Sequence, residues 1–341
     1  IMKNHKTKNF LIIGTVFCAL GTVLFASGIA AGGREYIKNT DLNTYNGSFS
    51  SAKSDGSHAI LEKKKIDSFQ NLNASLKHMD FAVRESEDEN YYLSYNVKTV
   101  KGVIPVSWQV ADGTLNLSEK NGKSASGYMQ IDIGFLQEFL TDGHVSDNAD
   151  MIENQIILYI PRDQTIENFS CQMNQGDFTL DSLNCQNLQL QTSTGDISLK
   201  NLHAKGGTIS DKDGDISITG SSLENTKLDA SLGDVSAEGS DFTDSTLSLS
   251  SGDAELSDVS FNNNCQITSK MGDVELSVPE KNLSTLVFSL DTNMGDIDIP
   301  DELNKKVVST DNNASNGQKS SDPQNHLTVK SDYGDISIRH S

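Results

Sequence analysis

Eight aspartates recur at nearly constant spacing in the second half of the chain, each directly after a glycine. Successive Gly-Asp pairs lie 19, 19, 19, 19, 20, 23 and 39 residues apart. A line of carboxylates could bind divalent cations, because calcium takes oxygen ligands. However, each repeat supplies only one such acid, and the Gly-Gly-x-Gly-x-Asp nonapeptide of calcium β-rolls is absent. We therefore interpret the pairs as turns and expect no metal; a metal ladder is the alternative, formed by Asp177, Asp196, Asp215, Asp234, Asp253, Asp273, Asp296 and Asp335.

The other reactive residue types form no recognisable site. The four cysteines, at 18, 171, 185 and 265, show no Cys-x-x-Cys spacing, and we expect buried thiols, with a Cys171–Cys185 bond left open. None of the seven histidines is in a His-Glu-x-x-His motif, and neither Gly-x-Ser-x-Gly nor Gly-x-x-x-x-Gly-Lys occurs. The sequence therefore predicts a protein without catalytic residues or cofactor. A polysaccharide-acting β-helix enzyme is the alternative.

The residues around each Gly-Asp pair alternate between apolar and polar. The positions two and four after each glycine are apolar in all eight repeats, and the position between them is polar, as in Ile197-Ser198-Leu199. The position five before each glycine is also apolar, as in Leu190 and Ile209. Period-2 alternation predicts strands with one buried face on both sides of the turn. A third side has Cys185, Leu223, Phe242 and Phe261 pointing inward.

A two-stranded unit of 19 residues cannot bury its apolar face alone. Stacking such units produces one continuous core, so we predict an all-β, single-stranded β-solenoid with 19-residue coils. The regular part covers residues 163–341, and 63–162 form an irregular beginning with an insertion at 118–150. We expect a disordered loop at about 303–326 to replace one coil, and the last strand, which ends in Arg339 and His340, to be an open edge.

The N-terminus has the pattern of a membrane anchor. Residues 10–31 are uncharged and as a helix would be about 33 Å long, enough to cross a bilayer. Lysines within residues 1–9 predict a cytoplasmic tail, so the body would lie outside the cell behind a flexible linker at 32–62. The expected location is the cell membrane, with a single pass. Secretion after cleavage of a signal peptide is the alternative.

Charge limits the partners. The formal net charge of −20 argues against nucleic acid, because phosphate contacts need clustered Lys and Arg. Acidic charge is compatible with cations, cationic peptides or simple solubility.

The strings GDISL, GDISI, GDVSA, GDVEL and GDIDI, preceded by Ile157 to Pro161, resemble the bacterial putative-adhesin β-strand-repeat family. The resemblance covers roughly residues 65 to 341. It implies a cell-envelope protein without known catalytic residues, some relatives being tied to responses against membrane-active antibiotics. We therefore expect a binding or scaffold module, with an envelope polymer, a cationic peptide or a membrane protein as partner. A role in envelope-stress sensing and a calcium-stabilised spacer remain open alternatives.

Overall fold

The structure is a computed structural model that describes residues 58–99, 103–120, 154–301, 303, 307 and 325–341. These all belong to one compact unit, Ser57–Gly122 with Met151–Ser341. The predicted tail, membrane helix, most of the linker and most of the 118–150 insertion lie outside the described residues. Within the described part, no helix has both the length and the apolar character needed to cross a membrane. Strand β1 begins at His58, so the last five residues of the predicted linker belong to the fold.

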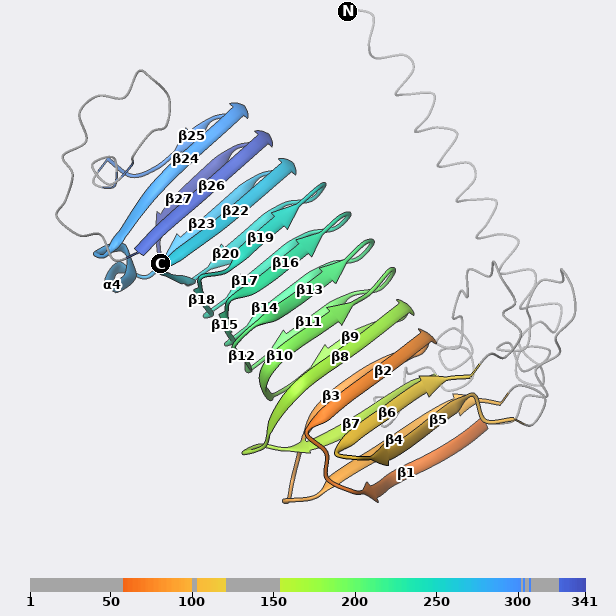
Figure 1. Cartoon of the computed structure of the whole chain (residues 1–341). Helices are drawn as coiled ribbons and strands as arrows, with labels where there is room; N and C mark the ends of the chain where they lie inside the picture. Colours follow the sequence, from red (N-terminus) through yellow and green to blue (C-terminus); the bar gives the residue numbers. More distant parts are fainter. Residues whose placement is uncertain (1–57, 100–102, 121–153, 302, 304–306, 308–324) are drawn as a thin grey trace, which may run out of the picture. The chain divides into compact units, whose positions relative to one another are not determined.

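Two long sheets form the unit (Figure 1). The first sheet has, in spatial order, β1 (His58–Ile66), β4 (Tyr91–Lys98), β7 (Gln155–Pro161), β3 (Asp80–Ser86), β9 (Phe178–Leu180), β11 (Ile197–Lys200), β14 (Ile216–Thr219), β17 (Val235–Glu238), β20 (Ala254–Ser257), β23 (Val274–Val278), β27 (Ile336–His340) and β25 (Ile297–Asp298).

The second sheet follows the strands that lead into each Gly-Asp corner. Its order is β5 (Val106–Ala111), β6 (Thr114–Glu119), β2 (Asn71–His78), β8 (Thr165–Gln175), β10 (Leu183–Gln191), β13 (Gly207–Asp211), β16 (Thr226–Ala230), β19 (Thr246–Leu249), β22 (Asn264–Met271), β26 (Asn325–Tyr333) and β24 (Leu286–Met294). The shorter strands β12 (Leu202–Ala204), β15 (Ser222–Glu224), β18 (Asp241–Thr243) and β21 (Ser260–Asn262) form a third side that joins this sheet through β10. The repeat thus folds as predicted, one coil per repeat.

The predicted alternation places the core correctly. Of the sixteen apolar residues two and four positions after the glycines, all but Ile297 and Ile299 are buried. The eight residues five positions before the glycines are buried too, as are the four predicted for the third side. Parallel pairing is in register, with Ile197 beside Ile216 and Leu199 beside Ile218, so like residues stack through the core.

The central coils have two further corners that contain residues with positive φ. The second corner holds Asn201, Gly220, Gly239 and Asp258. The third holds Asn225, Asp244 and Asn263. Asn, Asp and Gly are the residue types that adopt this left-handed conformation at the lowest cost. Both sets recur at 19-residue spacing, a sequence signal for this side that the Gly-Asp marker alone does not provide.

The C-terminal coils are not stacked in chain order, which corrects the prediction of an open last strand. Strand β27 pairs with β23 on one side and β25 on the other, so the coil that contains Gly334 lies between those of Gly272 and Gly295. The physical reason is Pro300. It has no N–H to donate to a neighbouring strand, so the short β25 is suited to the edge, whereas all five residues of β27 pair with β23.

The N-terminal part also departs from a simple solenoid. Strand β3 is inserted between β7 and β9, and β2 between β6 and β8. Beyond them, β4 adds antiparallel to β7, β1 adds antiparallel to β4, and β5 adds antiparallel to β6. The irregular part predicted for 63–162 therefore contains four strands of the parallel stack, β2, β3, β6 and β7, and an antiparallel cap formed by β1, β4 and β5. Phe178 of β9 packs edge-on against Phe81 of β3, with ring centroids 5.7 Å apart, which joins the two parts.

Helix α4 (Glu280–Leu283) closes the third side. The side-chain amide of Asn282 accepts a hydrogen bond from the backbone N–H of Phe261 (3.0 Å) and donates one to its carbonyl (3.0 Å). Asn282 is buried, so its amide occupies the place of a next strand and satisfies the edge of β21.

Candidate functional site

The predicted aspartates form a continuous hydrogen-bonded row along the Gly-Asp corner. The Oδ1 atom of each one except Asp296, the last in the row, accepts a hydrogen bond from the backbone N–H of the aspartate in the next coil, over 2.7–2.9 Å. Asp80 continues the row, because its Oδ1 accepts the N–H of Asp177 (2.9 Å). This acidic row comprises, in spatial order, Asp80, Asp177, Asp196, Asp215, Asp234, Asp253, Asp273, Asp335 and Asp296. The bonds join neighbouring coils rather than closing each turn on itself, and they offset the repulsion between stacked carboxylates.

The glycines of the row are required by packing as well as by φ. A Cβ on Gly233 would lie 2.1 Å from the carbonyl oxygen of Gly214 in the neighbouring coil, and its φ is +126°. The coils can therefore stack at this corner only without a side chain. The Gly-Asp pair is thus a stacking unit: the glycine permits the approach, and the aspartate caps the next amide.

Within the described residues, no group of three or more His, Cys, Asp or Glu side chains is arranged to hold a metal ion. In the acidic row each coil supplies one carboxylate, and each carboxylate except that of Asp296 already accepts a hydrogen bond from a backbone N–H. We expect millimolar calcium to leave the melting temperature of the chain within about 2 °C, less than the shift expected for about 1 kcal/mol of stabilisation. Differential scanning fluorimetry with and without calcium measures this, and a concentration-dependent rise would contradict it.

Asp211 is a second, buried carboxyl that the repeat pattern did not single out. It lies three residues before Gly214 and points inward, where its Oδ1 accepts a hydrogen bond from the Thr192 hydroxyl. Burial raises the pKa of Asp211. Hydrogen bonds from Thr192 and from the amides of Lys212 and Asp213 lower it, but the effect of burial is larger. Its Oδ2 has no hydrogen-bond partner within the described part of the chain. Asp211 therefore costs stability when it is charged.

We expect Asp211→Ser to stabilise the protein at pH 7 by about 1 kcal/mol, because it removes a buried, half-satisfied carboxylate. Ser269 occupies the equivalent position before Gly272 and donates to the carbonyl of that glycine, so serine fits this corner. The raised pKa means that the folded state binds a proton more readily than the unfolded state, so the wild-type chain regains stability as the pH falls through that pKa. Urea unfolding should show the gain shrinking toward about pH 4, near the ordinary pKa of aspartate. An equal gain at both pH values would contradict the argument.

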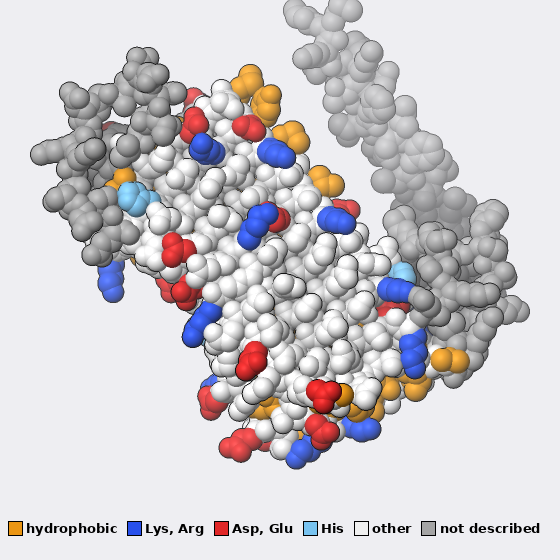
Figure 2. Space-filling view, viewed as in Figure 1, with side chains coloured by type: hydrophobic (Ala, Val, Ile, Leu, Met, Phe, Trp, Pro, Cys, Tyr) orange, Lys and Arg blue, Asp and Glu red, His pale blue; other side chains and the backbone are white. Residues whose placement is uncertain are grey.

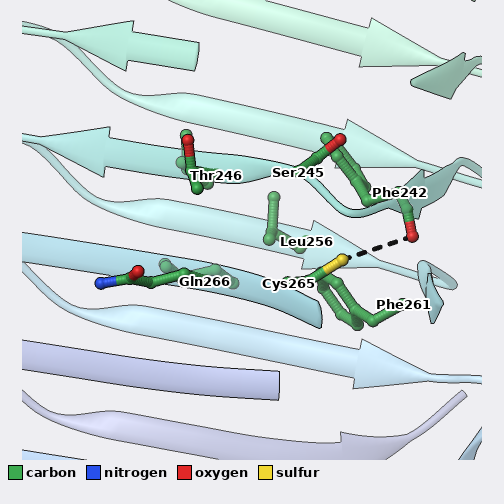
Figure 3. A pocket seen from close by; sticks show the side chains of 9 residues that line it. Phe242, Ser245, Thr246, Leu256, Phe261, Cys265 and Gln266 are labelled. Carbon is green, nitrogen blue, oxygen red and sulfur yellow. Dashed lines mark hydrogen bonds between the residues drawn. The ribbon is translucent and has the colours of Figure 1, made fainter. Parts of the chain in front are cut away.

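The three cysteines in the described part are free and buried, which settles the open question about Cys171 and Cys185. Burial raises the pKa of Cys185 to about 11 and raises that of Cys171 further, so neither is a reactive thiolate. Cys265 borders a recess lined by Phe242 and Phe261, and its Sγ donates to the carbonyl of Phe242 (Figure 3). The room inside is about 10 Å³, the space of one water molecule at most, so this recess cannot hold a substrate.

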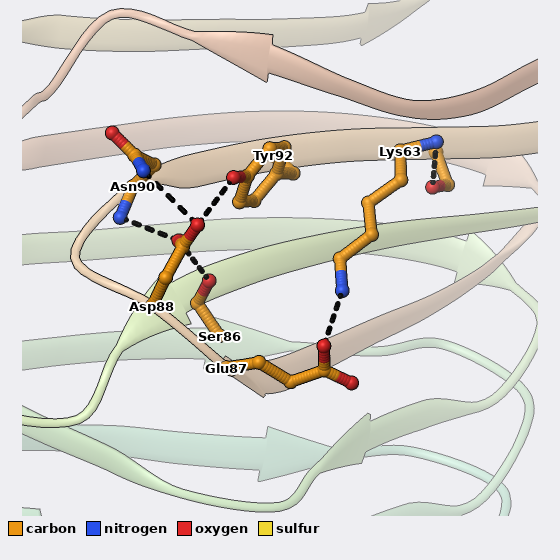
Figure 4. Close-up of polar contacts among 7 residues, drawn as sticks. Lys63, Ser86, Glu87, Asp88, Asn90 and Tyr92 are labelled. Atoms are coloured by element: carbon orange, nitrogen blue, oxygen red, sulfur yellow. Dashed lines mark hydrogen bonds and ion pairs between the residues drawn. The ribbon is translucent and has the colours of Figure 1, made fainter.

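A polar cluster around Asp88 closes the turn between β3 and β4 (Figure 4). The Tyr92 hydroxyl donates to Asp88 Oδ2 (2.6 Å), and the backbone N–H of Asn90 donates to Oδ1 (2.8 Å). These bonds lower the pKa of Asp88 to about 2, and the bond from Tyr92 has the largest effect. Next to it, the Lys63 ammonium pairs with Glu87 at 3.5 Å. Every carboxylate oxygen of Asp88 faces donors of its own turn, so the cluster is a turn closure.

An exposed line of apolar side chains lies beside the acidic row. Leu232, Met271, Tyr333 and Met294 each directly precede a corner glycine, and their exposed fractions are 53–65%. Backbone bonds such as Gly272 N–H to the Tyr333 carbonyl (3.0 Å) and Gly334 N–H to the Met294 carbonyl (3.1 Å) stack three of them in adjacent coils. Ser251 stands between Leu232 and Met271. We call these four apolar residues the apolar ridge, and hydrophobic side chains line this edge in Figure 2.

Sequence reasoning found the acidic row but missed the apolar ridge and Asp211. The signal for the ridge was available, since the residue before each glycine changes from Gln175, Thr194 and Asp213 to mostly apolar types further along. The sequence does not show that the ridge is continuous, because Tyr333 and Met294 are adjacent only through the exchanged order of the last coils.

The model of one protein family, Toastrack DUF4097, matches residues 69–339. Among solved structures, the chain is similar to a "putative lipid binding protein" from Parabacteroides distasonis, with 14% identity over 84% of this chain and 98% of that one and a TM-score of 0.45. It is also similar to a "putative adhesin" from Bacteroides fragilis, with 14% identity over 84% and 99% of the two chains and a TM-score of 0.38. A comparison with curated proteins finds no match. At these identities and TM-scores, the similar structures carry no argument about what this chain binds.

Proposed function

Because the chain belongs to the Toastrack DUF4097 family, we propose that it is a non-catalytic binding or scaffold module of the cell envelope. In this proposal residues 10–31 anchor the chain in the membrane with the N-terminus in the cytoplasm. The solenoid then stands outside the cell and presents its surface to an envelope component, in a structural role or as a sensor of envelope stress.

The observation that carries the proposal is the corner that combines the acidic row with the apolar ridge. The row is built from backbone-capping carboxylates, so its geometry is rigid and repeats from coil to coil. The ridge places large apolar side chains in solvent along several adjacent coils, where exposed apolar surface of this kind is typical of interaction sites. A rigid, extended surface of this type suits recognition of a long or elongated partner.

The net charge of −20 continues to argue against nucleic acid as that partner. An envelope polymer, a cationic peptide or another membrane protein remains within the proposal. An enzyme on this scaffold would need an acid paired with a base, whereas the acidic row contains only carboxylates, and nearly all of them are hydrogen-bonded to a backbone N–H of the next coil.

The test is photo-crosslinking of the full-length chain on intact cells, with the photoreactive residue at Ser251 between Leu232 and Met271. We expect one envelope component to be captured above background. The matched control carries the same photoreactive residue at Thr194, the equivalent position in a coil without the ridge. Capture of nothing above background from any site would leave only the structural spacer.

A further inference from the structure

The apolar ridge and the acidic row lie along the same corner and share the same coils. In every coil the ridge position and the aspartate are separated only by the glycine, as in Met271-Gly272-Asp273. Each corner consists of the glycine, the two residues before it and the aspartate after it. In the five coils from Gly233 to Gly295, these corners contain six aspartates and one lysine. All six aspartates are exposed, and Asp234, Asp253, Asp273 and Asp335 each use only Oδ1 for the backbone N–H of the next coil, which leaves Oδ2 for a partner.

The charge of the acidic row limits which partner can bind to the apolar ridge beside it. An anionic lipid surface would be repelled by the row, and a second copy of the same ridge would bring a second row of carboxylates nearby. A cationic segment gains from the same carboxylates. The apolar side chains require that the segment also be apolar along one side. The two methionines add flexible side chains that adapt to varied apolar surfaces.

The length and spacing of the ridge match a helix. Stacked coils lie about 4.8 Å apart, so the five coils from Leu232 to Met294 span roughly 19 Å. A helix rises about 5.4 Å per turn, close to the coil spacing, and roughly 13 residues cover this length. Same-side residues of an extended strand are roughly 6.6 Å apart, a poorer match to the coils.

We infer that the apolar ridge and the adjoining aspartates Asp234, Asp253, Asp273, Asp335 and Asp296 form a docking site for a cationic amphipathic helix. The apolar side of the helix contacts Met271, Tyr333 and Met294. Its lysines or arginines pair with the Oδ2 atoms of the acidic row. This inference rests on the proposed function and names the chemistry of its partner.

The test measures binding of a labelled 14-residue amphipathic Leu/Lys peptide to the full-length chain by fluorescence anisotropy. The decisive variant replaces Asp253, Asp273 and Asp335 with asparagine, which keeps the Oδ1 acceptor that caps the next coil and removes only the charge. We expect its Kd to rise about tenfold, from the loss of three exposed ion pairs. Its matched control carries the same change at Asp177, Asp196 and Asp215, where the ridge position is Gln175, Thr194 or Asp213, and should change Kd less than about twofold.

A second variant tests the apolar part. Met271→Ser with Tyr333→Ser and Met294→Ser should weaken binding by about tenfold or more, because it removes the exposed apolar surface. Ile60→Ser with Val103→Ser removes side chains that are similarly exposed, 60% and 59%, but lie outside the ridge, and should have no effect. Increasing sodium chloride should weaken binding to the wild-type chain.

The inference is overturned if the peptide does not bind, if both asparagine variants lose affinity equally, or if anionic phospholipid vesicles bind the ridge instead. The proposed function is separable from it. A component captured on intact cells by the chain with the serine-substituted ridge would leave the binding module standing while removing this site.

Discussion

Replacing Gly233 with alanine is expected to destabilise the solenoid by more than about 4 kcal/mol, in the range of exceptionally damaging single substitutions. The new Cβ would lie 2.1 Å from the carbonyl oxygen of Gly214 and 2.6 Å from its carbonyl carbon. Both are backbone atoms of the next coil, so no side-chain movement relieves the contact. The coils would have to separate at the corner, which also breaks the bond from the Asp234 N–H to Asp215. Urea unfolding followed by circular dichroism measures the loss.

Gly239 provides the matched control in the same coil. It also has a positive φ, +55°, but a Cβ there has no atom within 4 Å. Gly239→Ala should therefore cost only about 1 kcal/mol, the conformational penalty alone. Gly239→Asn should be nearly neutral, because Asn201 occupies this corner in another coil with φ +48°. Equal losses for Gly233→Ala and Gly239→Ala would contradict the account of the corner as a close backbone approach.

A chain that ends at residue 324 is expected to lose two coils rather than one. Removing β26 and β27 takes away the strands with which β24 and β25 pair. The buried residues Leu327, Val329, Ile336 and Ile338 are then lost, and Leu286, Phe288 and Leu290 lose their cover. At about 1.5–3 kcal/mol for each buried side chain, the loss is on the order of 10 kcal/mol. Limited proteolysis and hydrogen exchange should show residues 286–298 unprotected while β20 and β23 remain protected.

Two equivalent isoleucines test the same coil order without shortening the chain. Ile336 and Ile297 both lie two residues after a corner glycine, but Ile336 is fully buried in β27 and Ile297 is 41% exposed in β25. Ile336→Ser should cost about 3 kcal/mol or more, and Ile297→Ser less than about 1 kcal/mol. If the coils were stacked in chain order, Ile297 would be the costlier position, and that result would overturn the exchanged arrangement.

The regular part of the fold was predictable because its information is local. A strand reveals its buried face through period-2 alternation, and stacking identical coils in register repeats that face every 19 residues. The same residues, Ile197 and Ile216 for example, therefore mark both the strand and its partner in the next coil. The aspartates were also recognised as turn residues, although their hydrogen bonds reach the next coil instead of their own turn.

The buried carboxyl of Asp211 shows why individual polar residues were harder to predict from the sequence than the fold. The other coils place Met, Thr, Ala, Leu or Ser at its position, as in Thr192, Ala230 and Ser269, so no single residue type marks the position and the repeat pattern contains no warning of a carboxyl there. Only the packing of the neighbouring coils shows that this carboxyl is sealed from water and bonded to Thr192. Asn282 is a similar case, since its role depends on its distance from Phe261 in space.

The sequence by itself determined the coil: its length, its buried positions, and the Gly-Asp corner at which it stacks. Each of these follows from the chemistry of residues within one repeat. Tertiary structure alone decided the order of the coils at both ends, because β3 and β27 pair with strands distant in the chain, and any coil with a free edge could accept them. The apolar ridge depends on that order. Tyr333 continues the line of Met271 because β27 pairs with β23, whereas β25, which is followed by Pro300, lies at the edge.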